Sequence, residues 1–151
     1  MTERIYIAAV GRVNARGNSP DGIAGNLTAG GGPGMHARTG WLQGSPEAVL
    51  GGVEGQLPTL PDSLSAHRTR NNQLLLAALA QIQSTVDEAI ARVGRDRVAV
   101  VLGTSTSGLD EGDEHVRRMT DGETSTRLQY PQQELGEPSR FLELRSAPWR
   151  G

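Results

Sequence analysis

The chain has 151 residues, a formal net charge of −2 and 36% hydrophobic residues, a small share for a self-contained core. All 15 basic residues are arginine and cysteine is absent. Within this sequence that excludes a disulfide framework, a thiolate metal site, a cysteine nucleophile, a Schiff-base lysine and a P-loop. The near-neutral charge gives no reason to expect nucleic acid as a partner.

The first 34 residues predict a strand followed by a short helix. Residues 4–10, RIYIAAV, are apolar and rich in β-branched side chains, which favours a strand. Ser19 is a good N-cap, Pro20 suits the first helical position and Asp21 complements the helix dipole. The predicted helix covers residues 20–29, because GGGPG follows it.

Residues 30–66 form a Gly/Pro-rich excursion with scattered apolar positions. Its length exceeds that of an ordinary loop in a compact domain, which is about 12–15 residues at most. A hairpin within it is one alternative, but the sequence does not fix a register.

The strongest helical pattern covers residues 70–93. Its apolar positions are spaced by three and four, which predicts one long buried helix, and Gly94 is a natural C-cap. Residues 98–102 then form an apolar run without alternation, which is typical of a strand buried on both faces of a parallel sheet. The order of elements therefore predicts an α/β fold with a mostly parallel sheet. The apolar positions of the helix are Leu75, Leu79, Ile82, Val86, Ala89 and Val93.

Further helices are expected after this strand, one around residues 112–119 and a short helix or helix pair within residues 131–144. The N-terminus lacks the apolar h-region of a signal peptide, and no apolar run approaches the roughly 18 residues of a membrane span. We therefore expect a cytoplasmic protein with no membrane span.

A loop of small residues follows the predicted strand at 98–102. It lies where α/β proteins place their sites, at the C-terminal end of a parallel strand. It has no lysine for a phosphate loop, and neither of its serines has the flanking glycines of a GxSxG nucleophile elbow. From the residues alone we interpret it as a structural loop with a packing or site-wall role. Its residues are Gly103, Thr104, Ser105, Thr106, Ser107 and Gly108.

The histidines and the acidic residues give no metal-site pattern. His36, His67 and His115 lack HxH or HxxxH spacing. The acidic residues around His115 lack the spacing of a calcium loop, so a solvated acidic face is the better interpretation. We expect no metal and no cofactor. A polar group at the start of the long helix is interpreted as capping and ion pairing; its members are Arg68, Arg70, Asn71 and Asn72.

Two stretches carry a family resemblance. Residues 70–112, RNNQLLLAALAQIQSTVDEAIARVGRDRVAVVLGTSTSGLDEG, resemble the N-terminal part of bacterial β-ketoacyl-[acyl-carrier-protein] synthases of the thiolase fold. Residues 5–30 look like the opening strand, turn and first helix of that family, and residues 130–144 like the segment before its nucleophile. The resemblance implies an acyltransferase of fatty-acid or polyketide biosynthesis, which extends acyl chains by decarboxylative Claisen condensation. It also implies acyl carrier protein and a homodimer partner, and it places the small-residue loop at 103–108 near the active site and the dimer interface.

The sequence departs from that family at the catalytic residues. The family uses a cysteine nucleophile and two later histidines, whereas this sequence has no cysteine and its three histidines precede the nucleophile position. No catalytic residue is therefore carried over. We expect a partial N-terminal domain over residues 1–151, an incomplete N-terminal half truncated before the nucleophile, with an atypical tail at 145–151 and no activity of its own.

Two alternatives remain open beside the synthase interpretation. The chain could be a non-catalytic truncated paralogue that pairs with a full-length synthase, which co-purification would favour. It could instead be a small α/β ligand-binding domain with residues 30–66 as a lid, which saturable ligand binding would favour.

Overall fold

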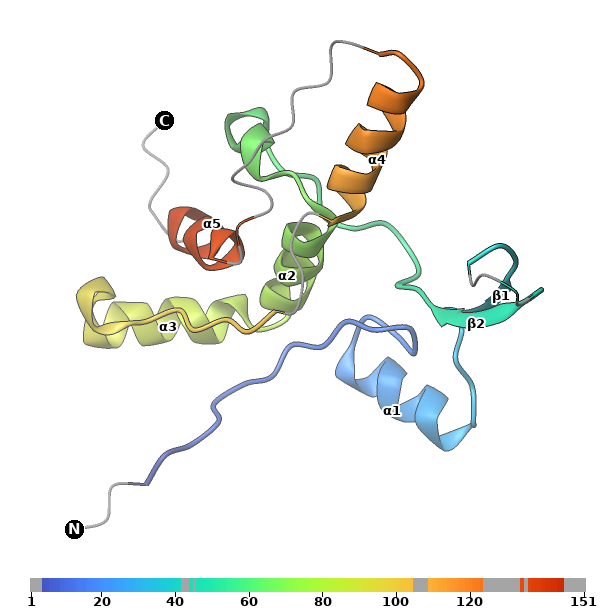
Figure 1. Cartoon of the computed structure of the whole chain (residues 1–151). Helices are drawn as coiled ribbons and strands as arrows, with labels where there is room; N and C mark the ends of the chain where they lie inside the picture. Colours follow the sequence, from blue (N-terminus) through green and yellow to red (C-terminus); the bar gives the residue numbers. More distant parts are fainter. Residues whose placement is uncertain are drawn as a thin grey trace. The chain divides into compact units, whose positions relative to one another are not determined.

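A computed structural model describes residues 4–41, 44, 46–104, 109–123, 134 and 136–145. The chain divides into two compact units, each formed by two separate stretches (Figure 1). The first unit comprises Met1–Leu57 and Leu76–Arg92, and the second comprises Pro58–Leu75 and Val93–Gly151.

The first unit begins with helix α1, Pro20–Thr28. Ser19 has an extended backbone, and its hydroxyl accepts a hydrogen bond from the backbone N–H of Gly22 at 3.1 Å. Pro20 occupies the first turn, where its missing N–H has no helical partner to lose. The prediction of a helix over residues 20–29 is confirmed.

The Gly/Pro-rich excursion contains an antiparallel hairpin of β1, Met35–Arg38, and β2, Ala48–Gly51. The register pairs Met35 with Gly51 and Arg38 with Ala48. This two-stranded sheet is the only one among the described residues. The described residues therefore do not show the predicted mostly parallel sheet, because their one sheet is antiparallel.

The two predicted strands at residues 4–10 and 98–102 are also wrong, because both segments lack regular secondary structure. Ile5 is 97% exposed and Val101 94% exposed. A strand exists only where a neighbour accepts and donates its backbone hydrogen bonds, and no described segment pairs with either run. Both runs have the composition of a strand, but neither has a neighbouring segment to form the backbone hydrogen bonds.

The predicted long helix over residues 70–93 is two helices, α2 (Arg70–Ala80) and α3 (Gln83–Val93), bent by 77°. At the bend, Gln81 and Ile82 donate their N–H groups to carbonyls three residues back instead of four. The Gln81 side chain also donates to the carbonyl oxygens of Arg12 and Asn18, both at 2.9 Å. These bonds fix the break, and only Asn72 is buried in either helix, so the prediction of one long buried helix is wrong.

Among the described residues, no single helix has both the length and the apolar composition needed to cross a membrane. The bent pair of α2 and α3, counted together, has the length and the apolar composition that such a crossing requires.

The second unit contains two short 3₁₀ turns, η1 (Asp62–His67) and η2 (Arg95–Arg97), and two helices, α4 (Leu109–Thr120) and α5 (Glu137–Arg145). The prediction of a helix around residues 112–119 is confirmed by α4, and α5 accounts for the helix expected within 131–144. Gly94 takes a φ of 85° directly after α3, as expected of a glycine at a helix C-terminus.

The buried apolar side chains of the described residues are few. Ile23 on α1 is 4% exposed in the first unit, whereas Leu60 and Phe141 are 2% and 0% exposed in the second. The second unit also buries Pro138 beside Phe141 on α5. Its core therefore lies where α5 begins.

Replacing Gly34 with alanine should destabilise the first unit. A Cβ at this buried position would overlap the Gly52 carbonyl oxygen and lie 2.9 Å from the Ala15 carbonyl oxygen. Both atoms belong to backbone that is hydrogen-bonded to Gly34 itself, so neither can move freely. We expect a loss of about 1–3 kcal/mol in the free energy of unfolding, measured by urea denaturation.

The matched control is Gly25→Ala on α1, where a Cβ would meet nothing within 4 Å. Alanine is the better helix former by about 1 kcal/mol, so this variant should be at least as stable as the wild type. Equal urea-denaturation midpoints for Gly34→Ala and Gly25→Ala would contradict the close backbone approach of Gly52 and Ala15 to Gly34.

Candidate functional site

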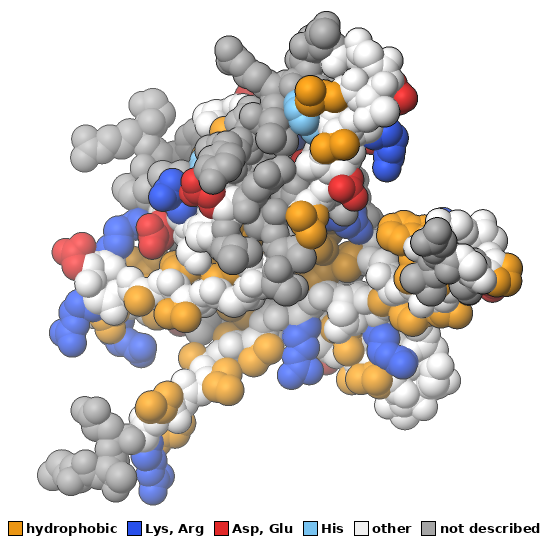
Figure 2. Space-filling view, in the orientation of Figure 1, with side chains coloured by type: hydrophobic (Ala, Val, Ile, Leu, Met, Phe, Trp, Pro, Cys, Tyr) orange, Lys and Arg blue, Asp and Glu red, His pale blue; other side chains and the backbone are white. Residues whose placement is uncertain are grey.

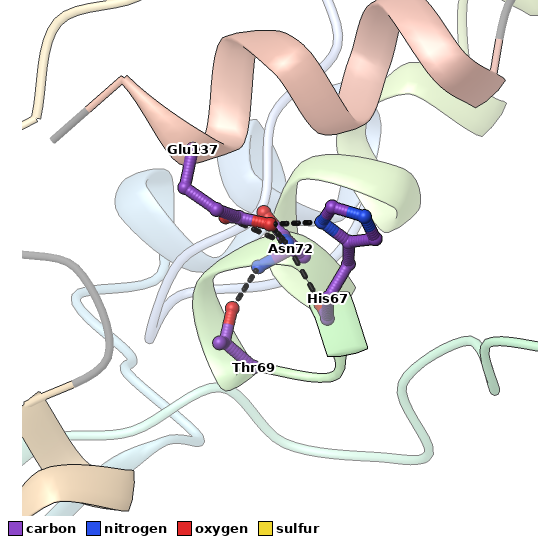
Figure 3. A network of polar contacts seen from close by, with 4 residues as sticks. All are labelled: His67, Thr69, Asn72 and Glu137. Atoms are coloured by element: carbon purple, nitrogen blue, oxygen red, sulfur yellow. Dashed lines mark hydrogen bonds and ion pairs between the residues drawn. The ribbon is translucent and has the colours of Figure 1, made fainter. Parts of the chain in front are cut away.

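A buried polar cluster connects the start of α2 with the start of α5 in the second unit (Figure 3). Its four members are His67, Thr69, Asn72 and Glu137. Three of them are almost inaccessible to solvent: Asn72 is 0% exposed, Thr69 1% and Glu137 2%. Burying polar groups in this way is tolerated only when they bond to one another.

The centre of the cluster is the Glu137 carboxylate. Its Oε1 lies 2.6 Å from Nδ1 of His67, whose side chain is 16% exposed. Because a carboxylate accepts hydrogen bonds and has no proton to donate, Nδ1 of His67 carries the proton and donates it to Glu137. The His67 ring also lies against Phe141, with ring centroids 6.0 Å apart.

Asn72 orients its amide toward the same carboxylate. Its Nδ2 donates to Oε1 and Oε2 of Glu137, both at 3.0 Å, and to the carbonyl oxygen of His67 at 2.7 Å. These three acceptors determine which way the amide points. Its Oδ1 is consequently left buried with no hydrogen-bond partner in the described structure.

Thr69 caps helix α2. Its hydroxyl accepts the backbone N–H of Asn72 at 3.2 Å, and its carbonyl accepts that of Gln73 at 3.1 Å. Glu111 on α4 accepts the backbone N–H of Arg70 at 2.9 Å. Arg68 pairs with Asp62 at 3.2 Å, which confirms the ion pairing expected in this region. The cap comes from Thr69 and not from the four residues expected to supply it, and the Asn72 side chain belongs to the buried cluster.

The histidine–carboxylate pair has the form of a catalytic acid–base pair, but its surroundings favour a structural role. Among the described residues, no serine or threonine hydroxyl hydrogen-bonds to His67. Both carboxylate oxygens of Glu137 already accept hydrogen bonds, Oε1 from His67 and Asn72 and Oε2 from Asn72. The cluster therefore holds α5 against the start of α2.

The predicted structural loop is described at Gly103 and Thr104, and Ser105, Thr106, Ser107 and Gly108 lie outside the described residues. Gly103 is exposed, and a Cβ there would meet nothing within 4 Å. The role of this loop near a site or an interface stays a prediction.

The other two histidines are not members of the cluster. His36 on β1 pairs with Glu54 at 2.6 Å in the first unit. His115 lies on α4 of the second unit, where Glu114 pairs with Arg117 at 2.9 Å and Arg118 at 2.8 Å. Within the described ranges, no three His, Asp or Glu side chains come together as metal ligands would.

Sequence reasoning missed Glu137, the residue on which the cluster depends. The Glu137-Pro138 pair is a recognisable helix start, since an acidic residue and a proline both suit the first turn. That signal predicts an exposed carboxylate, and nothing local indicates that His67 and Asn72, 70 and 65 residues away in sequence, bury it.

The elements and the cluster together define a helical chain with a small antiparallel sheet, held by buried polar contacts, and this arrangement matches a structure of the ketosynthase type. One matching solved chain comes from the complex of a ketosynthase (ApeO) with its chain length factor (ApeC) from Xenorhabdus doucetiae. The identity is 57% over 93% of this chain, with a TM-score of 0.84. The match supports the ketosynthase-like thiolase fold.

This chain spans 36% of the length of that solved chain. No family model matches the sequence, and no curated protein matches it.

Proposed function

We propose that the chain acts as a non-catalytic partner of a ketosynthase-type condensing enzyme. The observation that carries this proposal is the 57% identity to a chain of a complex in which a ketosynthase is paired with a chain length factor. The family's acyl-accepting nucleophile is a cysteine, and the 151 residues contain none. The partner would supply that nucleophile and receive the acyl group from acyl carrier protein.

A second candidate function is that of the N-terminal portion of a catalytic ketosynthase of fatty-acid or polyketide biosynthesis. The match to 36% of the solved chain favours it, because the catalytic residues of the family lie in later parts of the sequence. Reading the coding DNA beyond codon 151 in all three frames separates the two candidates. A further frame with a cysteine elbow and two histidine motifs would support the catalytic one.

Co-expression tests the partner proposal directly. A tagged copy of this chain should retain an untagged full-length ketosynthase through affinity and size-exclusion chromatography, with a mass of one chain of each. After incubation with acyl-loaded carrier protein, intact-mass spectrometry should find the acyl group on the ketosynthase and none on this chain. The Gly25→Ala variant, whose new side chain meets open space, serves as the matched control and should behave as the wild type.

Two results would contradict the proposal. One is a tagged, folded chain that retains no ketosynthase. The other is acyl transfer onto this chain, because a non-catalytic partner has no acceptor for it.

A further inference from the structure

The break between α2 and α3 has no local cause in the sequence. Residues 70–93 contain no glycine and no proline. Their apolar spacing of three and four residues continues across the break, from Leu79 to Ile82 and on to Val86. A sharp kink without proline or glycine usually arises where another group inserts into the ladder of backbone hydrogen bonds. The 77° bend therefore points to groups that compete with that ladder.

Two carbonyl oxygens at the break are contacted by such groups. In a continuous α-helix, the N–H groups of Gln81 and Ile82 would donate to the carbonyl oxygens of Ala77 and Ala78. In the structure, the side-chain amide of Gln81 donates to the Ala77 carbonyl at 3.4 Å. The backbone of Gly11 lies so close to the Ala78 carbonyl that a Cβ on this glycine would overlap it. A side chain and a distant backbone segment therefore lie where the two missing backbone bonds would form.

Residues 11–18 cross the break, and we call them the strap. Gln81 binds the strap through both atoms of its amide. Its Oε1 accepts the N–H of Arg12 at 3.1 Å, and its Nε2 donates to the carbonyl oxygens of Arg12 and Asn18, both at 2.9 Å. The strap and the break belong to the same compact unit. One side chain of the helix therefore makes three hydrogen bonds to the strap.

The strap is anchored to the rest of the first unit independently of the helix. The Ala15 carbonyl accepts the backbone N–H of Gly34 at 2.8 Å. The segment before the strap, residues 4–10, gives no comparable support, because Ile5 and Ile7 are 97% and 83% exposed. Figure 2 shows hydrophobic side chains along this N-terminal segment. Loss of the Gln81 bonds would therefore separate the helix from the strap while the anchor at Ala15 remains.

We propose that the strap is a conformational latch, which holds the helix bent, and that its release lets α2 and α3 join into one continuous helix. The N–H groups of Gln81 and Ile82 donate to carbonyls three residues back in the bent state and to carbonyls four residues back in the straight one. Neither state loses these two bonds, so the Gln81 side chain decides between them. This inference concerns the first unit and the helix that enters it, and it does not depend on the proposed function.

The test measures the length of the helix in the full chain. Because the sequence has no cysteine, Arg70→Cys and Arg92→Cys provide two unique and exposed sites for spin labels. Gln81→Ala removes the contacts to the strap and places a better helix former at the break. Opening a 77° bend at a rise of 1.5 Å per residue should lengthen the distance between the labels by about 7 Å in pulsed electron spin resonance.

Gln83→Ala is the matched control, because it makes the same substitution two residues later. The Gln83 side chain bonds to Asp87 at 2.8 Å within α3 and does not touch the strap, so the label distance should stay that of the wild type. Gly11→Ala tests the latch from the other side. Its new methyl group would overlap the Ala78 carbonyl and displace the strap, so the label distance should lengthen as it does in Gln81→Ala.

Hydrogen exchange and circular dichroism distinguish straightening from unfolding. In Gln81→Ala the Arg12 amide should exchange several-fold faster, because it has lost its acceptor, while the helical signal of the chain stays the same or rises. A wild-type label distance in both Gln81→Ala and Gly11→Ala would overturn the proposal, because the bend would then be independent of the strap. A broad distance distribution with a loss of helical signal would overturn it as well, since the released helix would fray and not straighten.

Discussion

Replacing Phe141 with alanine is expected to lower the free energy of unfolding of the second unit by about 3–5 kcal/mol. The Phe141 side chain is fully buried and lies beside the equally inaccessible Pro138. Truncation removes the largest apolar side chain of this core and leaves a cavity under the His67 ring, which packs on Phe141 in the structure. Loss of α5 should follow, because Phe141 is its main apolar anchor.

The measurement is urea denaturation followed by far-ultraviolet circular dichroism, with amide hydrogen exchange to locate the loss. Phe141→Leu is the matched control, since it keeps most of the apolar volume and should be clearly more stable than the alanine variant. Exchange should accelerate in α5 and the start of α2. Unchanged protection of α5 in Phe141→Ala would show that this helix is held by something other than its buried ring.

The sequence predicted well the elements whose causes are local. The adjacent residues Ser19 and Pro20 define the start of α1, and Gly94 marks the end of α3. Such signals need no knowledge of the rest of the chain, and the structure bears them out.

The failures have non-local causes. The apolar runs at residues 4–10 and 98–102 have the composition of buried strands, but a strand requires a hydrogen-bonded neighbour that no described residue provides. The break between α2 and α3 contains no glycine or proline. It is fixed by bonds from Gln81 to Arg12 and Asn18, which are 69 and 63 residues away in sequence.

The buried polar cluster likewise combines residues with local causes and one residue with a non-local cause. Thr69 at the start of α2 is a recognisable cap, and Asn72 lies three residues later, so half of the cluster is local. Glu137 is not, because its burial depends on the packing of α5 against residues far earlier in the chain. The local sequence around Glu137 does not indicate whether its carboxylate is solvated or is hydrogen-bonded to His67.

Replacing Glu137 with alanine should lower the free energy of unfolding by about 2–4 kcal/mol, because it leaves buried donors without an acceptor. The amide of Asn72 would lose two of its three contacts, both at 3.0 Å, and Nδ1–H of His67 would lose its partner at 2.6 Å. Urea denaturation measures the loss, and it should exceed that of an exposed acid such as Glu54→Ala, which breaks a surface histidine pair.

Glu137→Gln distinguishes the hydrogen bonds from the volume of the side chain. Its oxygen can still accept from Asn72, and its amide can donate to His67 once the imidazole proton moves to Nε2. We therefore expect a smaller loss, about 1 kcal/mol. Nitrogen-15 NMR of the ring should find Nδ1 protonated in the wild type and unprotonated in Glu137→Gln. A glutamine variant as unstable as the alanine variant, with Nδ1 still protonated, would mean that the carboxylate charge, and not the pattern of donors and acceptors, holds α5 in place.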